Sequence, residues 1–337
     1  MDIRSGLSSI MPVRKTESRI PENCQASDLG QASLSADGRA AVVSFITSPL
    51  VIGRGNTFIV FITDAVLAGS VQSFEWSFTE NDGPPTAEKT VIGEISHHPA
   101  ATGRLVTAVR CLDGGGAALA TLTLNQSVVS PHTGLEAMIA AGADEAGPSA
   151  ANPDVSRELV NDYNIYYQNV VPRSAALDDG FRRLVFAVLM ESTLQSSVAR
   201  RQADLAEMAA VLNAGSAGFA TLAGRGLGVA GLRPMLLAMT VGPHLPWTEL
   251  PADGPAHALA EEELRRKTAA LPEAARIDLF NLIRFPKSSI TQCGRAIETL
   301  RDRYFTGIDF DTVLSELSGT RAHWINRHYR EGPLKRA

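Results

Sequence analysis

Three glycines in the second half of the chain have the spacing of a phosphate-binding turn. Gly226, Gly228 and Gly231 spell G-x-G-x-x-G and precede a segment with helical character. Glycines at this spacing let backbone N–H groups approach a phosphate at the positive end of a helix. A dinucleotide site also needs a strand before the motif, whereas the residues before Gly226 have helical surroundings. The glycine-rich region 215–231 therefore predicts either a small-ligand site or a closely packed turn between helices.

A single carboxylate on an apolar helix face is the second candidate for chemistry. Glu191 follows Leu184 by seven residues and Val188 by three, so that the three side chains share one face of a helix. An apolar site raises the pKa of a carboxyl group and allows it to act as a general acid. An ion pair with Arg183 or Arg200 explains the same position without catalysis. Both interpretations stay open from the sequence.

The stretch LMESTLQSS around Glu191 resembles the helix of lysozyme-like lytic transglycosylases, in which a Glu-Ser pair carries the acid. The resemblance implies a cell-wall glycosidase that uses Glu191. The chain departs from the family pattern because neither a second carboxylate nor a G-L-M-Q-like motif stands at a matching place.

Histidines occur as two pairs, one in each half of the chain. His97 and His98 are adjacent and precede a proline, whereas His323 and His328 are five residues apart. Two metal ligands on one helix face stand three or four residues apart, so neither pair has ligand spacing. The sequence therefore predicts no metal site, and it contains no motif for another cofactor. The cysteines are spread over three regions and predict no disulfide framework: Cys24, Cys111 and Cys293.

Cations alternate with aromatic side chains near the C-terminus, in the stretch RAHWINRHYR. Such mixtures form binding hot spots through stacking and charge. Residues 276–337 carry 11 basic and 7 acidic side chains, net +4, whereas residues 131–275 carry 11 and 17, net −6. We expect a docking surface for an acidic protein partner or for a second copy of the chain; the alternative is that Trp324 caps the helical core. The expected interface residues are Arg321, Trp324, Arg327, Tyr329 and Arg330.

Composition limits the class of protein. The 337 residues have a net charge of −5, which argues against nucleic-acid binding because phosphates need a clustered cationic face. The first residues lack the apolar run of a secretory signal, and no window approaches the ~20 apolar residues of a membrane span. From these features we expect a cytoplasmic protein without a membrane span.

A composition change divides the chain. Residues 141–154 contain no aromatic and no β-branched side chain, and glycines and prolines interrupt any regular element there. Before this stretch the pattern indicates strands, and after it the pattern indicates helices. The predicted divisions are an N-terminal arm over 1–38, a β-sandwich over 39–130, a linker over 131–154 and a helical domain over 155–337.

One segment of the first half alternates strictly. Phe74, Trp76 and Phe78 share one face of the segment, and polar residues share the other, which is the period of a half-buried strand. We expect these three side chains in the core. About seven short strands joined by Gly, Asp and Pro turns favour a β-sandwich. The clearest are expected over 41–46, 56–63, 71–78, 89–95, 103–112 and 118–128.

The segments FEWSF, GRLVTAV, DG and LTL, within residues 40–129, resemble an immunoglobulin-like module of the PKD (polycystic kidney disease) type. The resemblance implies that Trp76 packs across two sheets. It also implies a spacer, adhesion or docking role. Modules of this kind without a secretion signal are associated with phage-like or contractile-injection assemblies.

The second half predicts roughly seven to nine helices, the last four over about 256–270, 273–285, 288–305 and 309–330. The expected fold is therefore an immunoglobulin-like β-sandwich followed by an all-α helical domain. The sequence favours a non-catalytic structural or interaction protein, a docking component of a larger complex. The alternatives are the cell-wall glycosidase that uses Glu191 and a small-ligand sensor that uses region 215–231.

Overall fold

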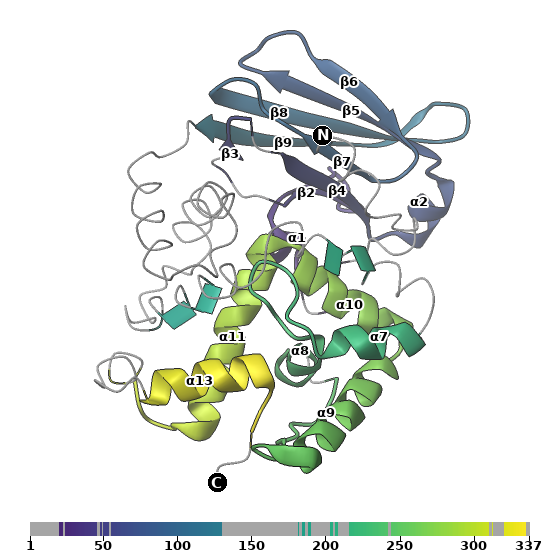
Figure 1. Ribbon diagram of the computed structural model, residues 1–337. Coiled ribbons are helices and arrows are strands. Elements are labelled where there is room, and N and C mark those ends of the chain that lie inside the picture. Colours follow the sequence, from purple (N-terminus) through teal and green to yellow (C-terminus); the bar gives the residue numbers. More distant parts are fainter. Residues whose placement is uncertain are drawn as a thin grey trace. The chain divides into compact units, whose positions relative to one another are not determined.

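The computed structural model describes residues 20–22, 24–45, 48, 50–53, 55–129, 181, 184–185, 188–189, 203–204, 206–207, 216–241, 244–309, 312 and 320–334. The described residues fall into two compact units, the first ending at 129 and the second beginning at 181. The first unit consists of two β-sheets and the second is helical, which confirms the predicted order of β before α (Figure 1). The predicted linker over 131–154 lies outside the described residues.

The smaller sheet of the first unit is antiparallel and has the order β1-β2-β4-β7. Its central strands β2 (Ala40–Ser44) and β4 (Asn56–Ile62) consist almost entirely of buried residues, as expected for strands rich in β-branched and aromatic side chains. The edge strands are β1 (Gln31–Leu34) and β7 (Glu94–His97).

The larger sheet has the order β3-β9-β8-β5-β6. Strand β3 pairs parallel with β9, and the other neighbours are antiparallel. The edge strand β6 is exposed along its length except at its half-buried last residue. The strands of this sheet are β3 (Leu50–Val51), β5 (Ser73–Glu80), β6 (Thr86–Thr90), β8 (Gly103–Leu112) and β9 (Ala118–Val129).

Two features of the first unit were not predicted from the sequence. Within the N-terminal arm over 1–38, residues 26–29 form a short helix, α1, and β1 pairs with β2. β1 has no buried alternating face, so the hydrophobic pattern of the sequence does not reveal this strand. A polar contact also connects it to the other sheet, since the Gln31 amide donates a hydrogen bond to the Asn125 carbonyl oxygen at 2.8 Å. The single strand expected over 89–95 is interrupted, since β6 ends at Thr90 and β7 begins at Glu94.

The core of the first unit lies between the two sheets. Phe74, Trp76 and Phe78 on β5 are all buried, and Trp76 has no exposed surface. Phe78 meets Phe58 of the other sheet with ring centroids 5.5 Å apart. The Trp76 indole Nε1 donates a hydrogen bond of 2.9 Å to Thr90 Oγ1, so that the polar edge of the ring is satisfied.

The second unit is built around α10 (Glu273–Arg284), in which every residue from 275 to 284 is buried. Phe285 separates α10 from α11 (Pro286–Tyr304), and Pro286 occupies the first turn of α11, where its missing N–H is tolerated. The other described helices include α7 (Ser216–Ala223), α8 (Pro234–Thr240), α9 (Gly254–Ala269) and α13 (Thr320–Glu331). Within the described residues, every helix is too short or too polar to span a lipid bilayer.

Truncation of the buried indole is expected to destabilise the first unit strongly. Trp76→Ala removes a fully buried aromatic side chain and leaves a cavity, so the free energy of unfolding should fall by about 3–5 kcal/mol. Urea unfolding followed by circular dichroism measures the loss. Val91→Ala is the control because Val91 is 71% exposed, and it should change the free energy by less than about 0.5 kcal/mol. An unchanged midpoint for Trp76→Ala would contradict the core position.

Candidate functional site

The glycine motif forms a tight turn after a helix. The element before Gly226 is helix α7, whereas a dinucleotide site requires a strand there. Leu227 and Leu232 exchange two backbone hydrogen bonds, each 2.9 Å long, so the chain reverses between them. Gly228 and Gly231 have φ angles of 69° and 59°, in the left-handed region that favours glycine.

The turn is packed closely against the rest of the second unit. A Cβ atom on Gly228 would lie 2.5 Å from the carbonyl oxygen of Ile283, near the end of α10. A Cβ atom on Gly226 would lie 2.8 Å from the carbonyl oxygen of Gly231, across the turn. The Tyr329 hydroxyl donates a 2.7 Å hydrogen bond to the Ala230 carbonyl oxygen. These contacts are those of the closely packed turn, the second of the two sequence interpretations.

Tyr329 is the clearest correction among the expected interface residues. It is 2% exposed, and its hydroxyl is bonded within the core. Ile325, four residues earlier on α13, has no exposed surface, so the two share the buried face of the helix. The neighbouring cations suggested a surface position, but the helical period decides which side chains are buried.

The expected interface arginines have partners within the second unit. Arg327 donates from Nε to Glu331 at 2.8 Å and from Nη2 to the Ala252 carbonyl oxygen at 3.4 Å. Arg321 lies over the Phe305 ring at 5.9 Å from its centroid. Arg330 is half-buried. The Trp324 side chain lies outside the described residues, so its expected place in the interface and the alternative, a cap on the helical core, both stay predictions.

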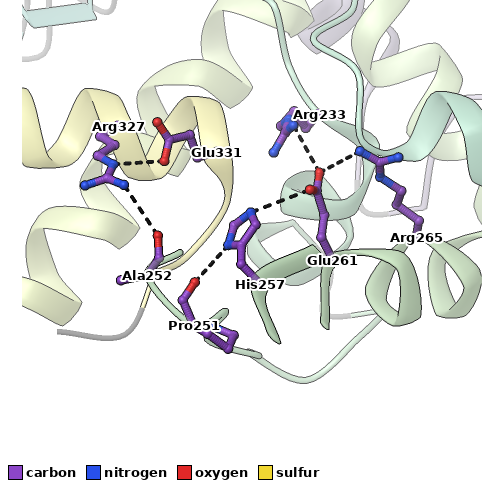
Figure 2. A network of polar contacts seen from close by, with 8 residues as sticks. All are labelled: Arg233, Pro251, Ala252, His257, Glu261, Arg265, Arg327 and Glu331. Carbon is purple, nitrogen blue, oxygen red and sulfur yellow. Dashed lines mark hydrogen bonds and ion pairs between the residues drawn. The ribbon is translucent and has the colours of Figure 1, made fainter. Parts of the chain in front are cut away.

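Glu261 on α9 is the centre of a polar network that local sequence patterns only partly reveal (Figure 2). Its Oε1 accepts hydrogen bonds from Arg265 Nη2 at 2.8 Å and from Arg233 Nη2 at 3.2 Å. Its Oε2 lies 3.6 Å from His257 Nε2. The other ring nitrogen, Nδ1, donates to the Pro251 carbonyl oxygen at 2.8 Å, since a carbonyl oxygen can only accept.

The network joins segments that are distant in sequence. Arg233 is the residue that immediately precedes α8, Glu261 belongs to α9, and His257 bonds to the loop before α9. Burial lowers the pKa of Arg233, and the Glu261 carboxylate opposes that shift. His257 and Arg265 lie four residues before and after Glu261 on α9, which places both beside its carboxylate. This spacing is visible in the sequence, but sequence reasoning missed it. The arrangement fixes the helices relative to one another and holds a partly buried arginine charged.

Polar side chains on the central helix α10 form a second group that sequence reasoning missed. Arg284 is 2% exposed and lies over the rings of Phe280 and Phe285, at 5.1 Å and 4.9 Å from their centroids. Arg276 is 7% exposed and lies 5.9 Å from the centroid of Phe219. Aromatic faces attract guanidinium groups, so these rings stabilise two buried charges.

The histidine pair of the first unit is not part of a metal site among the described residues. His97 ends β7, and its Nε2 is 3.1 Å from a carboxylate oxygen of Glu80 on β5. No group of three or more His, Cys, Asp or Glu side chains in the described part of the chain is arranged to hold a metal ion. The side chains of His323 and His328 lie outside the described residues.

Glu191 also lies outside the described residues, so both of its interpretations, an ion-paired side chain and a general acid, stay open. Comparison with protein-family models, with curated proteins and with solved structures finds no match to this chain.

The close packing of the turn predicts unequal effects of two glycine substitutions. Gly228 and Gly254 have similar φ angles, 69° and 75°, so alanine at either position should cost about 1–2 kcal/mol from the left-handed backbone. A Cβ atom on Gly254 meets no atom within 4 Å, whereas one on Gly228 meets the Ile283 carbonyl oxygen. Gly228→Ala should therefore lose about 1–3 kcal/mol more in urea unfolding. Equal losses for the two variants would show that the turn can move away from α10.

Proposed function

We propose that this protein is a non-catalytic docking or assembly component whose first unit is an immunoglobulin-like sandwich of the PKD type. The order of the strands carries the proposal. Immunoglobulin-like sandwiches place strands G, F and C side by side in one sheet, with C′ added in variable-type domains, and strands A, B and E in the other. Along the chain, strands β2, β4, β5, β6, β7, β8 and β9 correspond to A, B, C, C′, E, F and G. With this lettering the sheet orders β9-β8-β5-β6 and β2-β4-β7 agree with G-F-C-C′ and A-B-E.

A buried tryptophan supports the same proposal. Immunoglobulin domains carry a buried tryptophan on strand C. Trp76 lies on β5, the strand that corresponds to C in this order, and it has no exposed surface. Such modules serve as spacers or docking units, and the resemblance connects the chain with phage-like or contractile-injection assemblies. Because one fold can carry many functions, the proposal is tested by binding.

The proposed docking partner is a second copy of this chain. Residues 276–337 have a net charge of +4 and residues 131–275 a net charge of −6, so two copies are complementary in charge. Tyr329 is excluded from the docking surface because its side chain is 2% exposed. Arg321 and Arg330 on α13, both half-buried, are the expected docking residues.

Charge reversal on α13 is expected to abolish self-association. The double variant Arg321→Glu and Arg330→Glu should be monomeric in light scattering at low salt, whereas the unsubstituted chain should associate. The association should weaken as the screening length falls from ~10 Å at 0.1 M salt to ~3 Å at 1 M. Helical circular dichroism is the fold control and should be unchanged, because Arg321 and Arg330 are only half-buried, whereas Ile325 and Tyr329 are buried in the core.

Arg104→Glu is the matched control, because Arg104 is an exposed arginine of the first unit whose charge is paired with Asp82 at 3.7 Å. This variant should associate as the unsubstituted chain does. If the unsubstituted chain stays monomeric at low salt, or if Arg104→Glu has the same effect as the double variant, the proposed self-association is wrong.

A further inference from the structure

We propose that the loop of residues 98–102, between β7 and β8, is an acid-sensitive latch. Glu80 holds the loop against the end of the sandwich, and proton binding by Glu80 and His97 releases it. The position of the loop at one end of the strands makes it a switchable part of the surface of the first unit.

Glu80 provides most of the anchoring of the loop. It is the last residue of β5, and its carboxylate accepts hydrogen bonds from the backbone N–H groups of Ala100 at 3.0 Å and Ala101 at 2.8 Å. It also accepts from His97 Nε2 at 3.1 Å. One carboxylate on the larger sheet therefore binds three donors from the end of β7 and the loop. A protonated carboxyl group accepts more weakly and would lose these charge-assisted bonds.

Other contacts of the loop define which part of it can open. The Asn81 side chain donates to the Thr102 carbonyl oxygen at 2.8 Å, a bond that does not titrate and that fixes the far end of the loop. Gly53 N donates to the Pro99 carbonyl oxygen at 2.7 Å. The His98 ring packs against Gly55, where a Cβ atom would lie 2.7 Å from Nε2. Opening of the latch separates the loop from Gly53 and Gly55.

His97 is held in a partly apolar site. Its ring stacks on Phe78 with centroids 4.1 Å apart and planes inclined by 3°. Burial lowers the pKa of His97 below 6.5, and the contact with Glu80 opposes the shift without cancelling it. The other charged or titratable groups that act on the pKa of His97 are His98 and Glu88 on β6, and the β4 residue opposite is the neutral Asn56.

The direction of the pH effect follows from both groups. Burial acts to raise the pKa of Glu80, but the hydrogen bonds from Ala100, Ala101 and His97 outweigh it and hold the pKa below 4.5. In the proposed open state Glu80 loses two of its three donors, those of Ala100 and Ala101, and both Glu80 and His97 become hydrated, so that both bind protons more readily than in the closed loop. The closed state is fully stable above pH 6.5, weakens as His97 titrates below that value, and weakens further as Glu80 titrates below 4.5.

Hydrogen exchange of the full chain tests the latch. The protection factors of the Ala100 and Ala101 amides, corrected for intrinsic exchange, are measured by mass spectrometry from about pH 7.5 to about pH 4. Protection is expected to fall about tenfold for each unit by which the pKa of a titrating group differs between closed and open loop. Amides of the buried strand β4 should keep their protection over the same range.

Two variants separate the groups. His97→Gln keeps a donor for Glu80 without titrating, so the loss of protection below pH 6.5 should disappear and only the loss below 4.5 should remain. Glu80→Gln should reduce protection at every pH. Glu75→Gln is the control on the same strand, because Glu75 pairs with the exposed Arg110 at 2.7 Å, away from the loop. Protection that is independent of pH, an unchanged pH profile in His97→Gln, or parallel loss of protection in β4 would each overturn the proposal.

Discussion

The hydrogen bond from the Trp76 indole to Thr90 is the interaction on which the arrangement of the first unit depends. The ring fills the space between the sheets, and its Nε1 holds the Thr90 hydroxyl, which donates in turn to the Ile92 carbonyl oxygen at 2.6 Å. Thr90 and Ile92 lie where the chain leaves β6 of the larger sheet and approaches β7 of the smaller one. One buried side chain thus fills the core and fixes the crossing between the two layers.

The helical unit depends on close packing of backbone and charged groups. Gly228 lets the turn approach the end of α10, and Tyr329 from α13 binds the backbone of that turn. Glu261 then neutralises arginines from two segments. Removing one partner from such a network leaves a buried polar group unsatisfied. The loss of stability is then larger than the net contribution of the one hydrogen bond that is removed.

Local patterns predicted the elements better than the contacts between them. The alternation around Trp76 and the bounds of β8, expected over 103–112, could be read because one face of each strand is buried. β1 was missed because its pairing with β2 and the hydrogen bond of the Gln31 amide hold it, without a buried apolar face. Arg233 and Glu261 are 28 residues apart, and no local period connects them. Tyr329 was misplaced because its charged neighbours were given more weight than its spacing from Ile325.

The exposed strand β6 has a consequence for how copies of this chain can assemble. Glu88 lies opposite Trp76 in the register, so its carboxylate is on the side of the strand that faces the core. A strand added to this edge would extend the core over Glu88 and remove a charge from water, which is unfavourable. The sandwich is thereby protected against growth into a continuous sheet, and filaments built by edge-to-edge pairing at β6 are disfavoured.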